Sequence, residues 1–354
     1  MNNFEDLFLD SVPYECDECG GGMLYKGGGS YECRECGHVQ LDAFGKVKEY
    51  LDKNGGTQPM LVIAEKTGVP IAVLNKLLKD GRLQIPPGSK VYLRCEKCGC
   101  AIRSGRYCSK CELETLHEIK KLMEDEKKDA VVLGEVWEDA SKKMAYGEMR
   151  CYCTGDTLDS VMNYPLRNVI LDFAACHATA YDVVRLILHQ ADVYPVPFRY
   201  ALMNLLSSHD RPRALNVLVD RTGDGLSKPA MRDLRLTKEE YALARKRYCM
   251  CLDILCALPG CPTVYYGDEA GLTGPTDPFC RRPYPWGHED LELRNYVRAR
   301  LKHRQASEVL KRGKCEVRAI DDNTLRIRRF FDGEDAFGAP VISNAEEIFT
   351  IRRP

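Results

Sequence analysis

Glu135 is the first residue of this chain whose position suggests chemistry. The apolar run at residues 130–133 predicts a buried strand, Gly134 lets another group approach its backbone closely, and the glutamate follows at the strand end. Similar apolar runs end at Asp210 and Asp268, with helical patterns between them. This alternation is typical of a β/α barrel, whose catalytic side chains gather where the strands end. The sequence therefore predicts a site around Glu135.

Cysteine pairs are the second set of residues with a chemistry of their own. The chain has 18 cysteines, and nine of them lie between Cys16 and Cys111. Because they are paired as C-x-x-C in a chain without a recognisable export signal, metal ligation fits them better than disulfide bonding. Four thiolates hold one tetrahedral zinc ion, so two structural zinc sites are predicted, and Cys100 is a spare thiol that could replace Cys98. The predicted ligands are Cys16, Cys19, Cys33 and Cys36 for the first ion, and Cys95, Cys98, Cys108 and Cys111 for the second.

Composition and charge exclude few partners. The chain of 354 residues can hold two or three domains, and its formal net charge of −1 gives no global field that would favour nucleic acid or membrane. The longest apolar stretch, residues 250–266, contains Asp253 and two prolines, which argues against a membrane span. The acidic first residues do not resemble a signal peptide. We therefore expect a soluble, cytoplasmic protein.

The segment between the two cysteine sets, residues 41–94, predicts a compact helical module. Gly68 turns the chain into a helix expected from Pro70 to Asp80, with Ile71 and Leu74 among the residues that face the core. Helix, tight turn and helix form the helix-turn-helix pattern of many DNA-binding proteins. Residues 40–111 contain 13 Lys and Arg against 6 Asp and Glu. This surplus permits DNA binding, but three-helix modules also contact proteins, and both partners stay open.

A ribbon, a helix-turn-helix module and a second ribbon thus follow one another in residues 14–111. Their order resembles the small zinc-binding flagellar-operon and MerR-like proteins of bacteria, and the cysteines carry most of this resemblance. Residues 112–128 are highly charged with one narrow apolar stripe, which predicts a helical linker.

The sequence after residue 128 has a different character. It contains five blocks in a fixed order: Gly134–Asp139, Leu158–Pro165, Leu202–Asp210, Leu258–Gly271 and Asp277–Arg282. Residues 129–354 resemble the C-terminal half of the α-amylase family, in particular its neopullulanase and cyclomaltodextrinase branch. The resemblance implies a retaining α-glucosidic hydrolase that acts on α-1,4-glucans or maltooligosaccharides in carbohydrate metabolism. Calcium is implied by this resemblance alone.

The resemblance also implies roles for single residues. Glu135 matches the general acid/base of the family, and Asp210 matches the carboxylate that stabilises the transition state. The residues implied in substrate binding are His209, Trp137, Asn163, Tyr164, Arg281 and Arg282.

The nucleophile of the family is missing from this sequence. In the family it is the aspartate of a Gly-x-Arg-x-Asp block, and neither that block nor the expected Asp-x-x-x-Asn-His block occurs. Residues 1–128, where the first four barrel strands would lie, contain the cysteine pairs and the helical module instead. Two copies of this chain would supply two acids and still no nucleophile. We therefore expect impaired hydrolysis.

The expected organisation is multi-domain. A small zinc-ribbon and α-helical module precedes an α/β part, an incomplete (β/α)8 TIM barrel comprising strands 5–8, with a truncated C-terminal β-domain. Two alternatives remain: a zinc-dependent DNA-binding or regulatory protein with an inert amylase-like half, and an erroneous gene join. The expected segments are a zinc ribbon (1–40), the helix-turn-helix module (41–94), the second zinc knuckle pair (95–111), the linker (112–128), the half barrel (129–302) and a partial β-sandwich (303–354).

Overall fold

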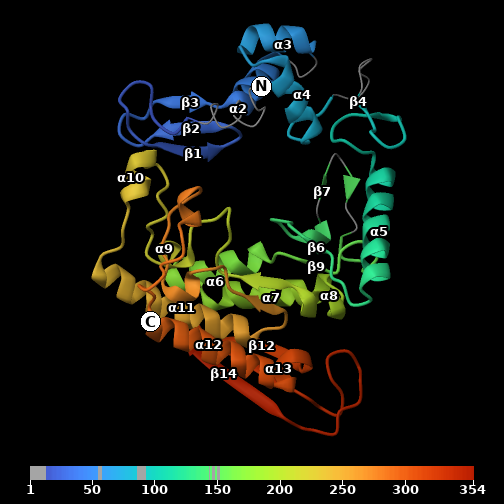
Figure 1. The fold of residues 1–354 in the computed structure, drawn as a ribbon, viewed down its shortest axis with the longest axis vertical. Helices are drawn as coiled ribbons and strands as arrows, with labels where there is room; N and C mark the ends of the chain where they lie inside the picture. Colours follow the sequence, from blue (N-terminus) through green and yellow to red (C-terminus); the bar gives the residue numbers. More distant parts are fainter. Residues whose placement is uncertain (1–12, 55–57, 86–92, 143, 146–147, 150–151) are drawn as a thin grey trace. The chain divides into compact units, whose positions relative to one another are not determined.

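The computed structural model describes residues 13–54, 58–85, 93–142, 144–145, 148–149 and 152–354. The chain divides into two compact units, and each is considered by itself (Figure 1). Unit 1 comprises Met1–Glu118, Met144–Met149 and Gly223–Asp233. Unit 2 comprises Ile119–Lys143, Arg150–Thr222 and Leu234–Pro354.

The described residues of unit 1 contain three small antiparallel sheets, and three helices separate the first two along the chain. The first sheet has the order β1-β2-β3, and helix α2 follows β3 directly. The second is the β4-β5 hairpin, and helix α5 begins shortly after it. The bounds are β1 Met23–Gly27, β2 Ser30–Cys33, β3 Val39–Leu41, α2 Ala43–Asn54, α3 Met60–Thr67, α4 Ile71–Lys79, β4 Leu93–Arg94, β5 Ala101–Ile102 and α5 Ser109–Glu126, with the β7-β8 pair Met144–Ala145 and Glu148–Met149 and helix α10 Lys228–Asp233.

Helices α3 and α4 lie where the sequence predicts helices. Helix α3 ends at Gly68, which adopts a left-handed conformation (φ 70°) and donates its backbone N–H to the carbonyl of Ala64. Helix α4 buries Leu74 and Leu77 in a core shared with Val47 of α2. The prediction that Ile71 faces this core is wrong, because its side chain in the first turn of α4 is 40% exposed.

Unit 2 is organised around four short parallel strands. Strand β6 (Leu133–Gly134) pairs with β9 (Ser160–Val161), and β10 (Met203–Leu205) pairs with β11 (Cys261–Thr263). A single parallel bridge between Met162 and Met203 joins the two pairs. The resulting order, β6-β9-β10-β11, places the chain segments that follow these strands on one edge.

Helices connect these strands and supply most of the core of unit 2. Helices α7 and α11 both begin with a capping box, formed by Thr179 with Asp182 and by Thr237 with Glu240. The core is built from apolar faces such as Ile170, Phe173 and Leu252, each at most 1% exposed. The bounds are α6 Tyr164–Ala175, α7 Ala180–Val193, α8 Val196–Ala201, α9 Ala214–Val217, α11 Lys238–Ala257, α12 Leu291–Ala306 and α13 Glu308–Arg312, with short 3₁₀ turns at Ala140–Lys142, Asp268–Ala270 and Phe279–Arg281.

The C-terminal residues form one antiparallel sheet of order β12-β13-β14. Residues 315–320 and 325–331 alternate between apolar and polar, which predicts two strands, and strands β12 (Lys314–Asp321) and β13 (Thr324–Phe330) lie there. Strand β14 (Glu346–Arg352) was not predicted. Alternate residues of this sheet, including Leu325 and Ile327, pack into the helical core.

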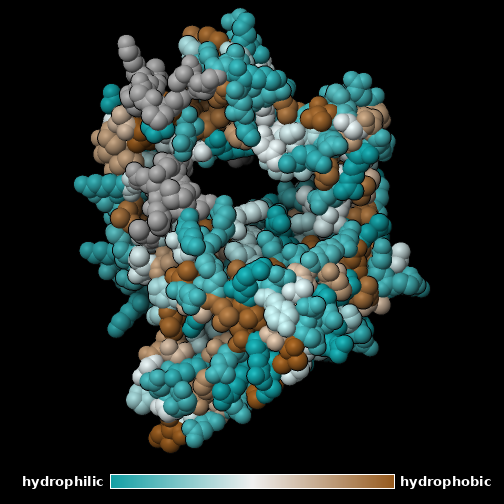
Figure 2. Space-filling model, turned by 180° about the vertical axis from the view of Figure 1, so that it is seen from behind, coloured by the Kyte–Doolittle hydropathy of each residue, from teal (hydrophilic) through white to brown (hydrophobic). Residues whose placement is uncertain are grey.

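No helix in the described part of the chain is long and apolar enough to cross a bilayer. The face shown in Figure 2 is mainly hydrophilic, and hydrophobic residues occur there singly or in small groups. Scattered apolar residues of this kind are ordinary on protein surfaces.

Candidate functional site

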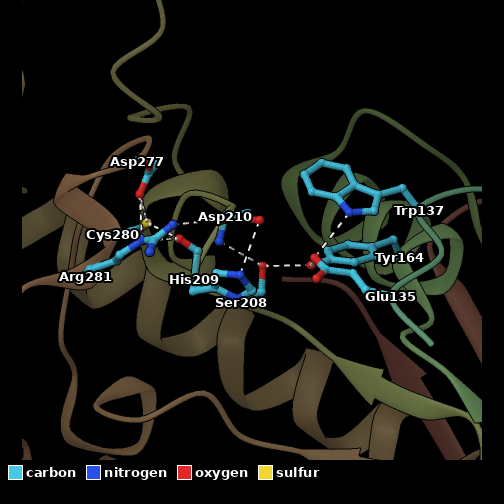
Figure 3. A network of polar contacts seen from close by, with 9 residues as sticks. All are labelled: Glu135, Trp137, Tyr164, Ser208, His209, Asp210, Asp277, Cys280 and Arg281. Carbon is cyan, nitrogen blue, oxygen red and sulfur yellow. Dashed lines mark hydrogen bonds and ion pairs between the residues drawn. The ribbon is translucent and has the colours of Figure 1, made fainter. Parts of the chain in front are cut away.

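Glu135 lies directly after strand β6, and its side chain is exposed. Trp137 donates its indole N–H to Glu135 Oε1 over 3.2 Å, and the Tyr164 hydroxyl lies 3.4 Å from the same oxygen (Figure 3). Gly134 is required just before it, because a Cβ there would lie 2.5 Å from Leu158 Cδ1. The strand end therefore presents a carboxylate that two aromatic side chains orient.

Trp137 and Tyr164 form an aromatic platform beside this carboxylate. Their rings stack with centroids 4.9 Å apart and planes 24° from parallel. Tyr164 begins helix α6 and is 2% exposed, whereas Trp137 is 42% exposed. Burial raises the pKa of Tyr164, and the nearby charges of Glu135 and Asp210 act in the same direction. Tyr164 therefore remains a neutral hydroxyl at neutral pH.

Asp210 follows strand β10 and is held by an arginine and a histidine side chain. Arg281 donates to Asp210 Oδ1 over 2.7 Å, and His209 Nε2 lies 3.3 Å from Oδ2 (Figure 3). Arg281 also contacts Asp277 at 2.7 Å and the backbone carbonyl of His209 at 3.0 Å. Its guanidinium is thus engaged by protein acceptors and positions Asp210, which differs from the substrate contact that the sequence predicts for Arg281.

The structure brings Glu135, His209 and Asp210 together. One carboxylate oxygen of each acid and one imidazole nitrogen all lie within 4.8 Å of one another. Two carboxylates and an imidazole at this spacing can share hydrogen bonds to one sugar ring. Cys280, within the last matching block, supports the arrangement, because its buried thiol contacts the backbone carbonyl of His209 at 3.0 Å.

Two predicted substrate-binding residues do not join this group. Asn163 is 2% exposed, and its side-chain amide is hydrogen-bonded to Gln190 and Asn204 in the interior. Its role there is to connect strand ends, which differs from the predicted substrate contact. Arg282 donates to the backbone carbonyl of Leu234 at 3.3 Å and so points to another segment.

Arg213 and Asp268 form a buried ion pair that sequence reasoning missed. Their side chains are 0% and 2% exposed, and Arg213 Nη1 lies 2.9 Å from Asp268 Oδ1. The guanidinium also donates to the carbonyl of Cys280 and lies 4.6 Å and 4.8 Å from the ring centroids of Tyr265 and Tyr266. Burial raises the pKa of Asp268 to about 6, against the opposing charge of Arg213. This pair fixes the segments after β10 and β11 to each other.

The first cysteine set forms a compact thiol cluster in unit 1. The sulfur atoms of Cys16, Cys19, Cys33 and Cys36 lie within 4.8 Å of one another, and the Cys19–Cys33 separation is 3.4 Å. Four sulfurs at about 2.3 Å from a tetrahedral zinc ion are roughly 3.8 Å apart. The thiols therefore fit one structural zinc ion, as predicted.

The second set contains five thiols rather than four. Cys95, Cys98, Cys100 and Cys108 have their sulfurs within 4.8 Å of one another, so Cys100, predicted to be spare, belongs to the cluster. Cys111, the predicted fourth ligand, is buried beside them and donates its backbone N–H to Cys108 Sγ over 3.4 Å. Burial, followed by its contacts with the other thiols, raises the pKa of Cys111. The donor set fits one zinc ion with one sulfur in excess.

Comparison with known proteins gives one family and several relatives. The sequence model of the α-amylase catalytic domain matches residues 109–326. An amylopullulanase of Thermoanaerobacter thermohydrosulfuricus is 33% identical over 225 residues, which cover 60% of this chain and 14% of that protein. A cyclomaltodextrinase of Geobacillus thermopakistaniensis is 32% identical over 208 residues, covering 58% of this chain and 30% of that protein. The chain thus spans less than a third of the length of either relative.

Among solved structures, the cyclic α-maltosyl-(1→6)-maltose hydrolase from Arthrobacter globiformis, in complex with that sugar, is similar to this chain. The identity is 26% and the TM-score 0.51, over 63% of this chain and 44% of that one. The likeness agrees with the four parallel strands of unit 2 and confirms the prediction of a partial TIM-barrel-like fold.

Proposed function

The chain belongs to the α-amylase family, and on this premise we propose that its site binds α-1,4-linked glucan and carries part of the machinery that hydrolyses it. The names of the relatives support this substrate class, because a cyclomaltodextrinase and a cyclic maltosyl-maltose hydrolase both act on α-glucans. The observation that carries the proposal is the group of Glu135, His209 and Asp210 beside the aromatic platform.

Glu135 suits the role of proton donor. Its carboxylate is exposed at the end of β6, where it can reach a glycosidic oxygen, and Trp137 and Tyr164 hold one of its oxygens. In glycosidases of this type a carboxylic acid protonates the leaving-group oxygen. The exposed part of the Trp137 ring offers a surface on which a sugar can stack.

Asp210 suits the role of a stabilising carboxylate. Arg281 and His209 fix its orientation, and its oxygens remain within reach of the sugar that Glu135 contacts. A fixed negative charge stabilises the oxocarbenium-like transition state and binds sugar hydroxyls.

Hydrolysis with retention also needs a carboxylate nucleophile about 5–5.5 Å from the acid. The family's Gly-x-Arg-x-Asp block is absent from the 354 residues, and the carboxylate grouped with Glu135 is Asp210, whose two oxygens already contact Arg281 and His209. We therefore propose that this chain alone binds glucan and turns it over poorly.

Hydrolysis and binding of maltotriose test this proposal. We expect calorimetry to detect binding to the unmodified chain, and reducing-sugar release to stay at the level of the buffer. Because no covalent intermediate forms, Glu135→Gln should leave this low rate unchanged, as should the matched control Glu138→Gln on the same exposed segment. Turnover that falls roughly 10²-fold or more in Glu135→Gln but not in Glu138→Gln would show that a nucleophile is present. The absence of any glucan binding would contradict the binding proposal itself.

A second candidate function concerns unit 1. The two thiol clusters and the α3–α4 pair, joined at the left-handed Gly68, support a zinc-stabilised module that binds DNA, as in a regulatory protein whose amylase-like part is inert. We expect anisotropy of a labelled duplex to show binding at about 50 mM salt that weakens strongly by about 200 mM and is lost in the double variant Cys95→Ser/Cys108→Ser. The absence of binding at low salt would contradict the DNA-binding proposal, and a protein would then be the expected partner of unit 1.

A further inference from the structure

Arg211 is an unpaired cation at the edge of the candidate site. It follows Asp210 directly, and its Cζ lies 5.5 Å from the centroid of the Trp137 ring. Its Nε is buried and has no hydrogen-bond partner. Within the described part of the chain, no aspartate or glutamate lies within ion-pair distance of Arg211. Because Nε is enclosed, a ligand would meet the outer Nη groups of this cation, whose charge no carboxylate of the described residues compensates.

Other arginines around the site differ from Arg211 because a carboxylate compensates their charge, although Nη2 of Arg213 is likewise buried without a hydrogen-bond partner. Arg281 is paired with Asp210 and Asp277, and Arg213 is paired with Asp268. Their charges are compensated by the protein itself. Arg211 therefore takes no part in the ion pairs that connect the segments around Asp210, Asp268 and Asp277.

Arg167 adds to the positive charge near Arg211. It is 3% exposed, and two of its nitrogens donate to the backbone carbonyls of Leu206 and Pro212. Burial, followed by the charge of Arg211, lowers the pKa of Arg167 to about 10. The two guanidinium groups thus lie close enough to repel each other, and an anion bound at Arg211 would be stabilised by both.

We propose that Arg211 binds an oxyanion carried by the sugar, a phosphate or carboxylate substituent on the glucose unit that stacks on Trp137. The Nη1 and Nη2 groups of the guanidinium, unlike the enclosed Nε, can present N–H bonds side by side to two oxygens of a phosphate or carboxylate. Neutral hydroxyls could accept the same bonds but would leave the charge uncompensated. This inference rests on the proposed glucan binding and narrows its substrate class to anionic α-glucans.

Tryptophan fluorescence gives a direct binding measurement. The chain has two tryptophans, so Trp286→Phe leaves Trp137 as the single reporter. In this background, maltose, maltose 6′-phosphate and the matching 6′-carboxylate are titrated, with inorganic phosphate as a further probe. Charge-assisted hydrogen bonds predict roughly tenfold tighter binding of the two charged sugars than of maltose. A preference for only one of them identifies the substituent as a phosphate or as a carboxylate.

Variants assign the preference to Arg211. Arg211→Met should abolish it, and Arg211→Lys, which keeps the charge without the fork, should retain part of it. The matched control is Arg328→Met, because Arg328 stacks on Phe330 at 4.0 Å in the C-terminal sheet. It should keep the full preference. Thermal unfolding of each variant verifies that it is folded.

Three outcomes overturn the inference: equal affinity for neutral and charged sugars, a preference that survives Arg211→Met, or tight binding of inorganic phosphate with no effect of the sugar. Maltose binding without a preference would leave the glucan proposal intact. Failure of every sugar to bind would contradict that proposal as well, so the two failures can be told apart.

Discussion

Removing the metal from the two cysteine clusters is expected to unfold both ribbons of unit 1 while unit 2 stays folded. Each ribbon has almost no apolar core: the buried residues are Cys16, Met23 and Cys33 in one, and Cys95, Ile102 and Cys111 in the other. Structural zinc contributes about 10–16 kcal/mol to such small folds. Without it, hydrogen exchange at residues 13–41 and 93–111 should become fast.

The measurement is zinc content by mass spectrometry, followed by hydrogen exchange before and after chelation. We expect about two zinc ions per chain, and one in Cys16→Ser and in the double variant Cys95→Ser/Cys108→Ser, because the second cluster has one sulfur in excess. Cys176→Ser is the matched control, because this exposed cysteine lies in unit 2, outside both clusters. Tryptophan fluorescence, which reports on unit 2, should not change. Chelation that leaves zinc content and exchange unaltered would show that the thiols do not hold a structural ion.

Arg213→Met is expected to cost about 3–5 kcal/mol of the free energy of unfolding of unit 2. The substitution leaves Asp268 buried without its cation and removes hydrogen bonds to the carbonyls of Tyr266 and Cys280. Because burial raises the folded-state pKa of Asp268 above that of the unfolded chain, its ionisation costs stability as the pH rises through about 6. The deficit of the variant should therefore be smaller near pH 4 than near pH 7.

Urea unfolding followed by tryptophan fluorescence measures this effect. The matched control is Arg221→Met, which breaks an exposed pair with Glu240 and should change stability by at most about 1 kcal/mol. Adding Asp268→Asn to Arg213→Met removes the stranded charge and should restore part of the loss. Equal midpoints for Arg213→Met and Arg221→Met would mean that the buried pair does not hold the two segments together.

The family and the partial barrel could be predicted because they depend on local patterns. Apolar runs that end in polar residues place Glu135 and Asp210 at neighbouring strand ends, since parallel strands end on one edge of a sheet. The C-x-x-C spacing likewise predicts that the paired cysteines lie close together in the structure.

The partners of the arginines and of Asn163 could not be predicted, because they come from distant parts of the chain. Arg281 contacts Asp210, which is 71 residues away, and Arg213 contacts Asp268, which is 55 residues away. Nothing in the local sequence distinguishes these paired arginines from the unpaired Arg211. The choice between Cys100 and Cys111 depends in the same way on how the hairpin and helix α5 pack.

The four-stranded sheet consists of two strand pairs, β6-β9 and β10-β11, which are joined by the single bridge between Met162 and Met203. Glu135 follows a strand of the first pair, and Asp210 follows a strand of the second. Asn163 connects the two pairs, because its backbone N–H donates to the carbonyl of Met203 over 2.9 Å and its side chain donates to Asn204. A buried amide thus links the two strand pairs that carry the carboxylates, and a small opening between these pairs would separate the carboxylates without moving either from its own strand.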